Sequence, residues 1–121
     1  MKKIIIIAAV IFITFSLSSC SHGSPKSVVD SYFNALQKGD YTTAMSYTTL
    51  NDEEIQEQAK KLEGLEFKVS EYEILDETIN DDKNTATVQV KYKFTSLMGE
   101  NEVNDKEIKL IKKDKQWKIE E

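Results

Sequence analysis

The spacing of hydrophobic and polar positions changes along the chain and divides it into three parts. Residues 4–17 are apolar or weakly polar and carry no charge, and Lys2 and Lys3 precede them. From residue 25 to residue 62, apolar side chains recur at intervals of three and four, which predicts amphipathic helices. From residue 65 to residue 119 they alternate with polar side chains, which predicts strands with one buried face.

The helical part contains the start and stop signals of three helices. Ser24 followed by Pro25 is typical of a helix N-terminus, and Gly39 predicts the end of that helix in the left-handed conformation. Asp40 is placed to cap a second helix, and the polar run 51–54 starts a third, weaker one with acids at its positive end. The apolar positions of the first helix are Val28, Val29, Tyr32, Phe33 and Leu36.

The alternating part predicts four strands separated by polar turns. The first strand starts near residue 65, and a one-residue slip in its pattern predicts a bulge near Ser70 and Glu71. The second strand has the clearest alternation, and the last one contains Trp117 and Ile119. Turns are expected at residues 80–84, 98–101 and 112–116. The inward positions of the second strand are Ala86, Val88, Val90, Tyr92 and Phe94.

Helices followed by four antiparallel strands make an α+β pattern. One face of the predicted sheet is apolar, and the other is rich in Lys, Thr and Glu. We therefore expect the N-terminal helices to pack on the apolar face of a single four-stranded antiparallel sheet.

The N-terminal apolar segment has the layout of a secretory signal peptide: a positive end, an apolar middle and small residues at its close. Residues 4–17 form about 21 Å of helix, which is shorter than the ~30 Å hydrocarbon core of a bilayer. The following Leu17-Ser18-Ser19-Cys20 resembles the lipobox of bacterial lipoprotein precursors, which implies diacylglyceryl attachment to the Cys20 sulfur and cleavage just before it. A short uncleaved membrane anchor is the alternative.

Removing the signal peptide, residues 1–19, leaves 102 residues: the lipidated Cys20 with a short linker at 20–24, and one domain at 25–121. This remainder has 14 basic against 21 acidic residues, and every basic residue is Lys. An acidic domain without Arg is poorly suited to nucleic acid or to anionic lipid, so we expect no nucleic-acid partner and membrane attachment through the lipid alone. The membrane is either the outer face of the cytoplasmic membrane or an outer membrane.

The pattern around the first helix resembles the opening of the nuclear-transport-factor-2-like (NTF2-like) superfamily. Residues 85–88 (TATV) and 113–119 (KDKQWKI) resemble later strands of that superfamily, in a branch of small bacterial lipoproteins whose domain has no assigned function. The resemblance implies a curved sheet wrapped around the first helix as a cone, with a pocket at its open end. Lys115 stands where many relatives have Gly, which implies a looser or strained turn. The matching first residues are Val28, Val29, Tyr32, Phe33, Ala35, Leu36, Gly39, Asp40, Tyr41 and Ala44.

Few residues of the domain can carry catalysis or bind a cofactor. The only Cys is Cys20, and the only His is His22 in the linker. A Ser or Thr nucleophile would lack an imidazole base, and transition-metal sites usually need His or Cys. The acidic stretch 76–82 lacks the Gly of a calcium loop and is interpreted as a solvated turn. We expect no metal site and no cofactor.

Tyrosines are the remaining candidates for a site. Through the resemblance, Tyr32 aligns with the first-helix tyrosine that supports the enolate in ketosteroid isomerase, but residues 48–52 lack the matching Asp base, and no second acid is identified for the pocket. We favour Tyr32 as a core aromatic at a pocket rim. Trp117 is interpreted as covering the sheet, and the Lys cluster from Lys106 to Lys118 as a solvated strand face. The candidate pocket-lining residues are Tyr32, Tyr47, Tyr72 and Tyr92.

These observations predict a membrane-anchored, exported lipoprotein that is not catalytic. It would bind a small apolar ligand or an envelope protein through the cone mouth or the exposed sheet. The alternative is a small isomerase, dehydratase or hydrolase that uses Tyr and a carboxylate in the cone. A third interpretation is assembly, including a homodimer, through pairing of the sheets.

Overall fold

The computed structural model describes residues 23–121, so the predicted signal peptide and the lipidation of Cys20 lie outside the described residues. Helices precede strands, and the four strands form one antiparallel sheet in the order β1-β2-β3-β4. The predicted α+β architecture is confirmed. The elements are α1 (Pro25–Lys38), α2 (Tyr41–Met45), α3 (Asp52–Gly64), β1 (Lys68–Ile79), β2 (Thr85–Ser96), β3 (Gly99–Lys113) and β4 (Gln116–Ile119).

The helices begin and end at the capping residues that the sequence predicts. The Ser24 hydroxyl accepts the backbone N–H of Ser27 at 3.2 Å, and Gly39 ends α1 with φ of +76°. The Asp40 carboxylate caps α2. Asn51 starts α3 with a reciprocal capping box, in which side chain and backbone of Asn51 and Glu54 bond to each other.

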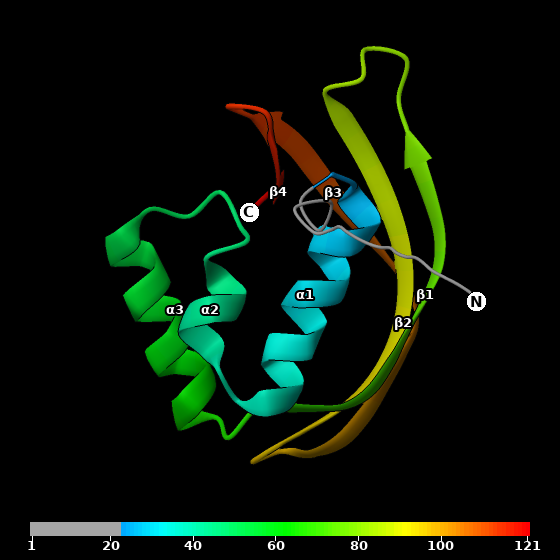
Figure 1. Ribbon diagram of the computed structural model, residues 1–121. Coiled ribbons are helices and arrows are strands. Elements are labelled where there is room, and N and C mark those ends of the chain that lie inside the picture. Colours follow the sequence, from blue (N-terminus) through cyan, green and yellow to red (C-terminus); the bar gives the residue numbers. More distant parts are fainter. Residues whose placement is uncertain (1–22) are drawn as a thin grey trace, which may run out of the picture.

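The sheet curves around α1, and α2 and α3 lie on the far side of that helix (Figure 1). Bulges contribute to this curvature, because an extra residue bends its strand and increases its twist. β1 shifts register between Val69 and Glu71, where the sequence predicts a bulge. Further shifts occur around Leu75 in β1 and around Asn104 and Asp105 in β3, and these were not predicted.

The core lies between the inner face of the sheet and α1. Val29 and Phe33 of α1 are almost fully buried. They belong to one cluster with inward residues from every strand. The alternation predicted for β2 is confirmed, because its inward side chains are buried or half-buried. The buried strand residues are Val69, Ala86, Val88, Val90, Leu110, Trp117 and Ile119. Among residues 23–121, no helix is both long and apolar enough to cross a bilayer.

Two predicted turns are shorter in the structure. The turn placed at residues 98–101 is formed by Leu97 and Met98, and β3 already begins at Gly99. A tertiary contact fixes it, because the Leu97 N–H donates to the Leu65 carbonyl at 2.9 Å. The turn placed at 112–116 contains only two residues, since Lys113 and Gln116 pair directly.

Asp114 and Lys115 form this second turn, with φ of +51° and +67°. A two-residue hairpin of this kind places both central residues in the left-handed region, where glycine or asparagine is usual. The turn is therefore tight and strained rather than loose, which is one of the two outcomes expected for Lys115.

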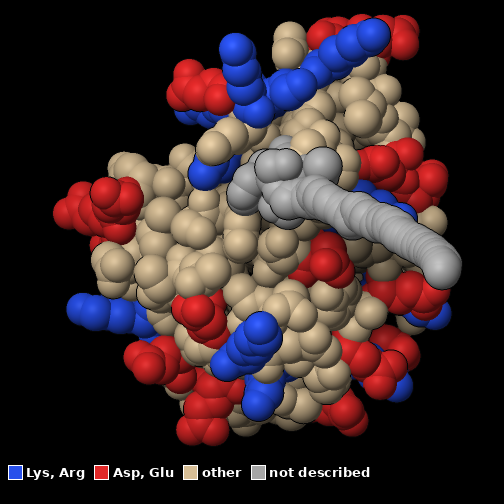
Figure 2. Space-filling model, in the orientation of Figure 1, with Lys and Arg blue, Asp and Glu red and all other residues tan. Residues whose placement is uncertain are grey.

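The outer face of the sheet is charged. Lys91 pairs with Glu73 at 3.3 Å and Lys93 with Glu71 at 3.9 Å, each across β1 and β2. On the side of the molecule shown in Figure 2, charges of both signs are interspersed around the margin, and much of the centre is uncharged.

Candidate functional site

A small cavity lies between α1 and the inner face of the sheet. Its volume is about 120 Å³. The lining combines an apolar floor with four polar side chains from α1, β2, β3 and the segment after β4. The apolar residues are Phe33, Leu36, Phe67, Ile108 and Ile119, and the polar ones are Tyr32, Tyr92, Lys106 and Glu121.

Tyr32 and Tyr92 supply two phenol groups to this cavity. Burial raises the pKa of Tyr32 far above that of a free tyrosine, and the nearby Glu121 carboxylate and Tyr92 raise it further. Burial also raises the pKa of Tyr92. Neither hydroxyl has a hydrogen-bond partner within residues 23–121. Both phenols therefore stay protonated at neutral pH, and each half-buried O–H can donate a hydrogen bond to water or to a ligand.

Lys106 and Glu121 line the cavity because alternate residues of a strand point to the same face of the sheet. Lys106 precedes the inward Ile108 and Leu110, and Glu121 follows the inward Trp117 and Ile119. Lys106 is exposed, as interpreted, but its pairing partner is the inward Val90, so it lies on the inner face of the sheet and not on the outer one. The acid that the sequence analysis did not find is Glu121. Continuing the alternation by one step would have indicated both residues.

The two opposite charges do not pair with each other, since no ion pair within 4.0 Å joins Lys106 and Glu121. Glu121 is held by its backbone, whose N–H donates to the Thr49 hydroxyl at 3.1 Å. The cavity thus has two neutral donors, one cation and one carboxylate around an apolar floor.

Only two of the four candidate tyrosines line the cavity, although Tyr72 pairs with Tyr92 across β1 and β2. The Tyr72 ring stacks on Phe33, and its hydroxyl donates to the Asp30 carboxylate at 2.8 Å. Burial and this Asp30 carboxylate raise the pKa of Tyr72 to about 12. Tyr47 lines shallow surface hollows beside Asp30 and beside Trp117.

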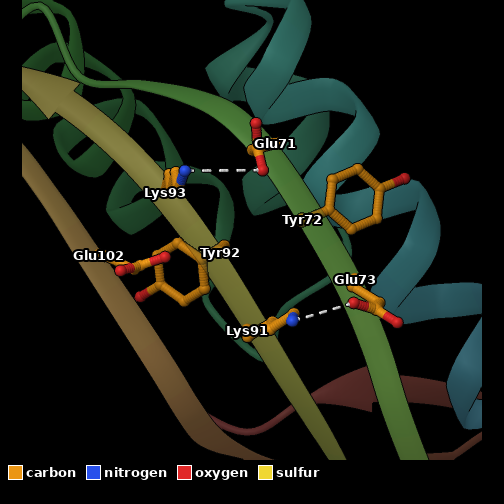
Figure 3. Close-up of a pocket in the computed structure, with 7 residues that line it drawn as sticks. All are labelled: Glu71, Tyr72, Glu73, Lys91, Tyr92, Lys93 and Glu102. Carbon is orange, nitrogen blue, oxygen red and sulfur yellow. Dashed lines mark ion pairs between the residues drawn. The ribbon is translucent and has the colours of Figure 1, made fainter.

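A larger hollow of about 490 Å³ lies on the sheet where β1, β2 and β3 meet. Figure 3 shows its lining, with the two ion pairs from β1 to β2 drawn as dashed lines. Its charged side chains largely compensate one another, which leaves little to attract an apolar ligand. The lining residues are Glu71, Tyr72, Glu73, Lys91, Tyr92, Lys93 and Glu102.

The cone cavity limits what can enter it. Typical pockets for drug-sized ligands measure about 300–1,000 Å³, and a cavity of about 150 Å³ holds one benzene. At about 120 Å³, this cavity fits a group the size of one side chain or a five-membered ring. Within residues 23–121, no group of three or more His, Cys, Asp or Glu side chains could hold a metal ion.

Solved structures share this architecture. A ketosteroid isomerase-like protein from Erwinia carotovora atroseptica is 13% identical over 82% of this chain and 90% of its own, with a TM-score of 0.63. A proposed NTF2-like transpeptidase from Campylobacter jejuni is 25% identical over 80% of this chain and 97% of its own, with a TM-score of 0.50.

A SEC-C motif containing protein from Psychrobacter arcticus is 15% identical over 83% of this chain, with a TM-score of 0.59, and this chain spans only 60% of its length. These likenesses establish the NTF2-like fold. A comparison with curated proteins found no significant match. A family model, the domain of unknown function DUF4878, matches residues 18–120. Because that match covers most of the chain, the protein belongs to the DUF4878 family.

Proposed function

We propose that the protein is an exported lipoprotein, tethered to a bacterial membrane through Cys20, whose NTF2-like domain binds a small ligand in the cone cavity without catalysis. The lipobox-like Leu17-Ser18-Ser19-Cys20 supports the tether. Two or more acyl chains hold a protein stably at a membrane, whereas one holds it only marginally. The short linker keeps the domain within about 14 Å of the bilayer.

The observation that carries the binding proposal is the Tyr32 hydroxyl, whose half-buried side chain lines an apolar cavity and which has no acceptor within residues 23–121. A ligand oxygen would satisfy this donor, and the apolar floor would bind the ligand's carbon skeleton. The preferred ligand is therefore small, largely apolar and equipped with one oxygen acceptor. Tyr92 and Lys106 offer further donors to the same oxygen.

Cyclopentanone and cyclopentane test this assignment, because they differ in the acceptor oxygen. Binding to the full chain in detergent is followed through the methyl NMR signals of Ile108 and Ile119, which line the cavity. We expect the ketone to bind more tightly, and Tyr32→Phe to weaken ketone binding about 5-fold, the size of one neutral hydrogen bond. Tyr47→Phe is the matched control and should change nothing. Equal affinities for the two probes would refute the acceptor preference.

The pH dependence gives a second check. Because the pKa of Tyr32 is raised, the phenol keeps its proton and its donor capacity throughout mildly alkaline pH. Ketone affinity should stay constant from about pH 6 to pH 9, where a free tyrosine is also still protonated. A steep loss of affinity within that range would show that a different group makes the contact.

Mass spectrometry tests the tether. Intact mass of the protein from cells should show loss of residues 1–19 and addition of acyl chains at Cys20, and an inhibitor of signal peptidase II should preserve the precursor. Cys20→Ala should remove the acyl mass and leave residues 1–19 attached to the chain. An unprocessed Met1 on the wild-type cellular protein would contradict the proposal.

A second candidate function is supported by one observation, the Glu121 carboxylate beside Tyr32. A carboxylate base and a phenol donor can together remove a proton next to a carbonyl. The C–H bond breaks, the proton goes to Glu121, and Tyr32 donates to the enolate oxygen. If this reaction occurs, the protein will exchange the α-deuterons of labelled cyclopentanone for solvent protons, and Glu121→Gln will abolish exchange but not binding. No exchange above the buffer rate supports the binding role.

A further inference from the structure

A long part of β3 has no neighbouring strand on its outer side. β3 runs from Gly99 to Lys113, but β4 pairs only with Leu110–Lys113, and the last backbone bond joins the Glu120 N–H to the Lys109 carbonyl at 2.8 Å. Figure 1 shows β3 continuing well past the short β4. Within residues 23–121, the edge from residue 99 to residue 108 is therefore unpaired.

Within residues 23–121, the outer edge of β4 is occupied, whereas that of β1 is covered at a single point. The backbone of β4 bonds to the segment after α2, since the Thr49 N–H donates to Ile119 at 2.9 Å and the Ile119 N–H to Tyr47 at 2.8 Å. At β1, the Gln37 side chain of α1 donates to the Ser70 carbonyl at 3.1 Å. An open edge is a template for another strand; within residues 23–121 both β1 and β3 present one, and only that of β3 adjoins the cone cavity.

The open edge is acidic on the outer face of the sheet. Antiparallel pairing turns the backbone groups of alternate residues toward opposite sides. The Lys109 carbonyl points toward β4, so the N–H and C=O groups of Glu107, two residues earlier, point to the same side, where no strand follows. Beyond the bulge, the backbone groups of Glu102 and Glu100 also point to this free edge. These three glutamates pair with outward residues of β2 (Thr95, Lys93 and Gln89) and so share the outer face.

The cone cavity opens at the same edge. Lys106 and Ile108 of β3 line it, and their side chains lie on the inner face. A strand added beside β3 would place alternate side chains on that inner face. One of them would come next to the cavity, whose volume of about 120 Å³ matches a single apolar side chain. Edge and cavity together thus form a site with backbone bonds for affinity and one pocket for specificity.

We propose that the open edge of β3 binds an extended peptide segment of a partner protein in which basic and apolar residues alternate. The basic side chains would face Glu100, Glu102 and Glu107 on the outer face, and an apolar side chain would enter the cone cavity. This proposal goes beyond the proposed small-ligand function and places a different occupant in the same cavity. A second copy of this chain is disfavoured, because pairing two β3 edges would bring acidic rows together.

Two features restrict the contact. The bulge at Asn104 and Asp105 divides the edge into two short runs, so the bound segment is short. Lys106 lies on the inner face at the cavity with Glu121, so a basic residue of the peptide is disfavoured there and an apolar one is accepted.

A fluorescent heptapeptide of alternating lysine and leucine is the probe, titrated by anisotropy into the full chain in detergent. Its control has the same composition with four lysines followed by three leucines, so charge and hydrophobicity are identical but the alternation is lost. We expect the alternating peptide to bind about 10-fold more tightly, since only it satisfies both faces of a strand. Equal binding would mean unspecific attraction to an acidic protein and would overturn the proposal.

Variants at Glu107 separate backbone bonding from charge. The Glu107 N–H points to the free edge, so proline there spares the β2–β3 ladder and removes a donor to the peptide. Glu107→Ala keeps that donor and removes only the charge. We expect affinity to fall about 3-fold in Glu107→Ala and about 10-fold in Glu107→Pro. Equal loss in the two variants would exclude strand addition.

Modifying the peptide and leaving the protein unchanged gives a test that does not depend on whether a variant folds. N-methylation of the central leucine or of an adjacent lysine removes one backbone donor from one edge of the peptide. One of the two forms should lose about 10-fold in affinity while the other binds normally. Identical affinities of the two N-methylated peptides would overturn the proposal.

The two proposals can fail separately. If the alternating peptide does not bind but cyclopentanone does, the cavity function stands and the edge inference is wrong; if neither binds, both are wrong. Self-association that excludes the peptide would identify a second copy as the occupant and refute the inference.

Discussion

The two ends of β3 show how one strand can be built for two purposes. Near β4, Leu110 is almost fully buried, and Trp117 and Ile119 of the next strand cover the core beside it. Toward the other end, every residue from 99 to 107 except Val103 is exposed, and no strand pairs beyond β3 within residues 23–121. The covered end stabilises the fold, whereas the open end leaves backbone groups available for binding.

Truncating inward side chains at the two ends should give the largest contrast. We expect Leu110→Ala to lower the free energy of unfolding by about 3 kcal/mol, because it leaves a cavity in a packed core. Val103→Ala, at a half-buried position, should cost about 1 kcal/mol or less. Urea unfolding of the two variants measures the difference. Similar losses would mean that the open end is as tightly packed as the covered one.

Amide hydrogen exchange probes the backbone itself. The Ile111 N–H faces β4 and lies within the β3–β4 ladder, whereas the Glu107 N–H faces the open edge. We expect Glu107 to exchange at least about 100-fold faster than Ile111 after correction for intrinsic rates. Adding the alternating peptide should slow Glu107 selectively. Strong protection of the Glu107 amide without peptide would show that this edge of β3 is not open.

The turns at the two ends of β3 should respond in opposite directions. Gly99 has φ of +110° and open space around its Cβ position, so Gly99→Ala should destabilise through backbone strain alone, by about 1–2 kcal/mol. Lys115 already occupies the left-handed region, so Lys115→Gly should stabilise by about 0.5 kcal/mol. Thermal unfolding measures both, and a destabilised Lys115→Gly would show that the lysine side chain itself stabilises the turn.

The ion pair on the outer face should matter least. Lys91 and Glu73 are 51% and 62% exposed at their side chains, and such exposed pairs contribute about 0.5 kcal/mol or less. Lys91→Ala should therefore leave urea unfolding almost unchanged, and added salt should remove even that small effect. If Lys91→Ala lowered the free energy of unfolding as much as Leu110→Ala, the outer face would contribute to stability as strongly as the core.

Local chemistry made most of the fold predictable. Ser24, Gly39, Asp40 and Asn51 act within a few residues of themselves, so their capping roles can be recognised without tertiary information. The alternation of β2 is clear because that strand is central and its inward side chains are fully buried as far as Val90 and half-buried at Tyr92 and Phe94. Such features depend on residues that are close in sequence, so the structure contains them as predicted.

The candidate site was less predictable because it depends on contacts between distant residues. The stretch GENEVNDKE (99–107) has one apolar residue, and only pairing with β2 reveals it as strand. Its bulge at Asn104 and Asp105 interrupts the alternation, so the two halves of the stretch do not follow one pattern. Tyr32 and Tyr92 share a cavity with Glu121 only because the sheet curves around α1, and no local pattern encodes that meeting.

The extra residue at Leu75 has a consequence for how this fold can diversify. Each bulge adds one residue to a strand while the flanking positions keep their faces. Deleting such a residue would straighten the sheet locally without turning any neighbouring side chain inside out. The width of the cone can therefore change through single insertions and deletions in a strand, with the residues that line it left untouched.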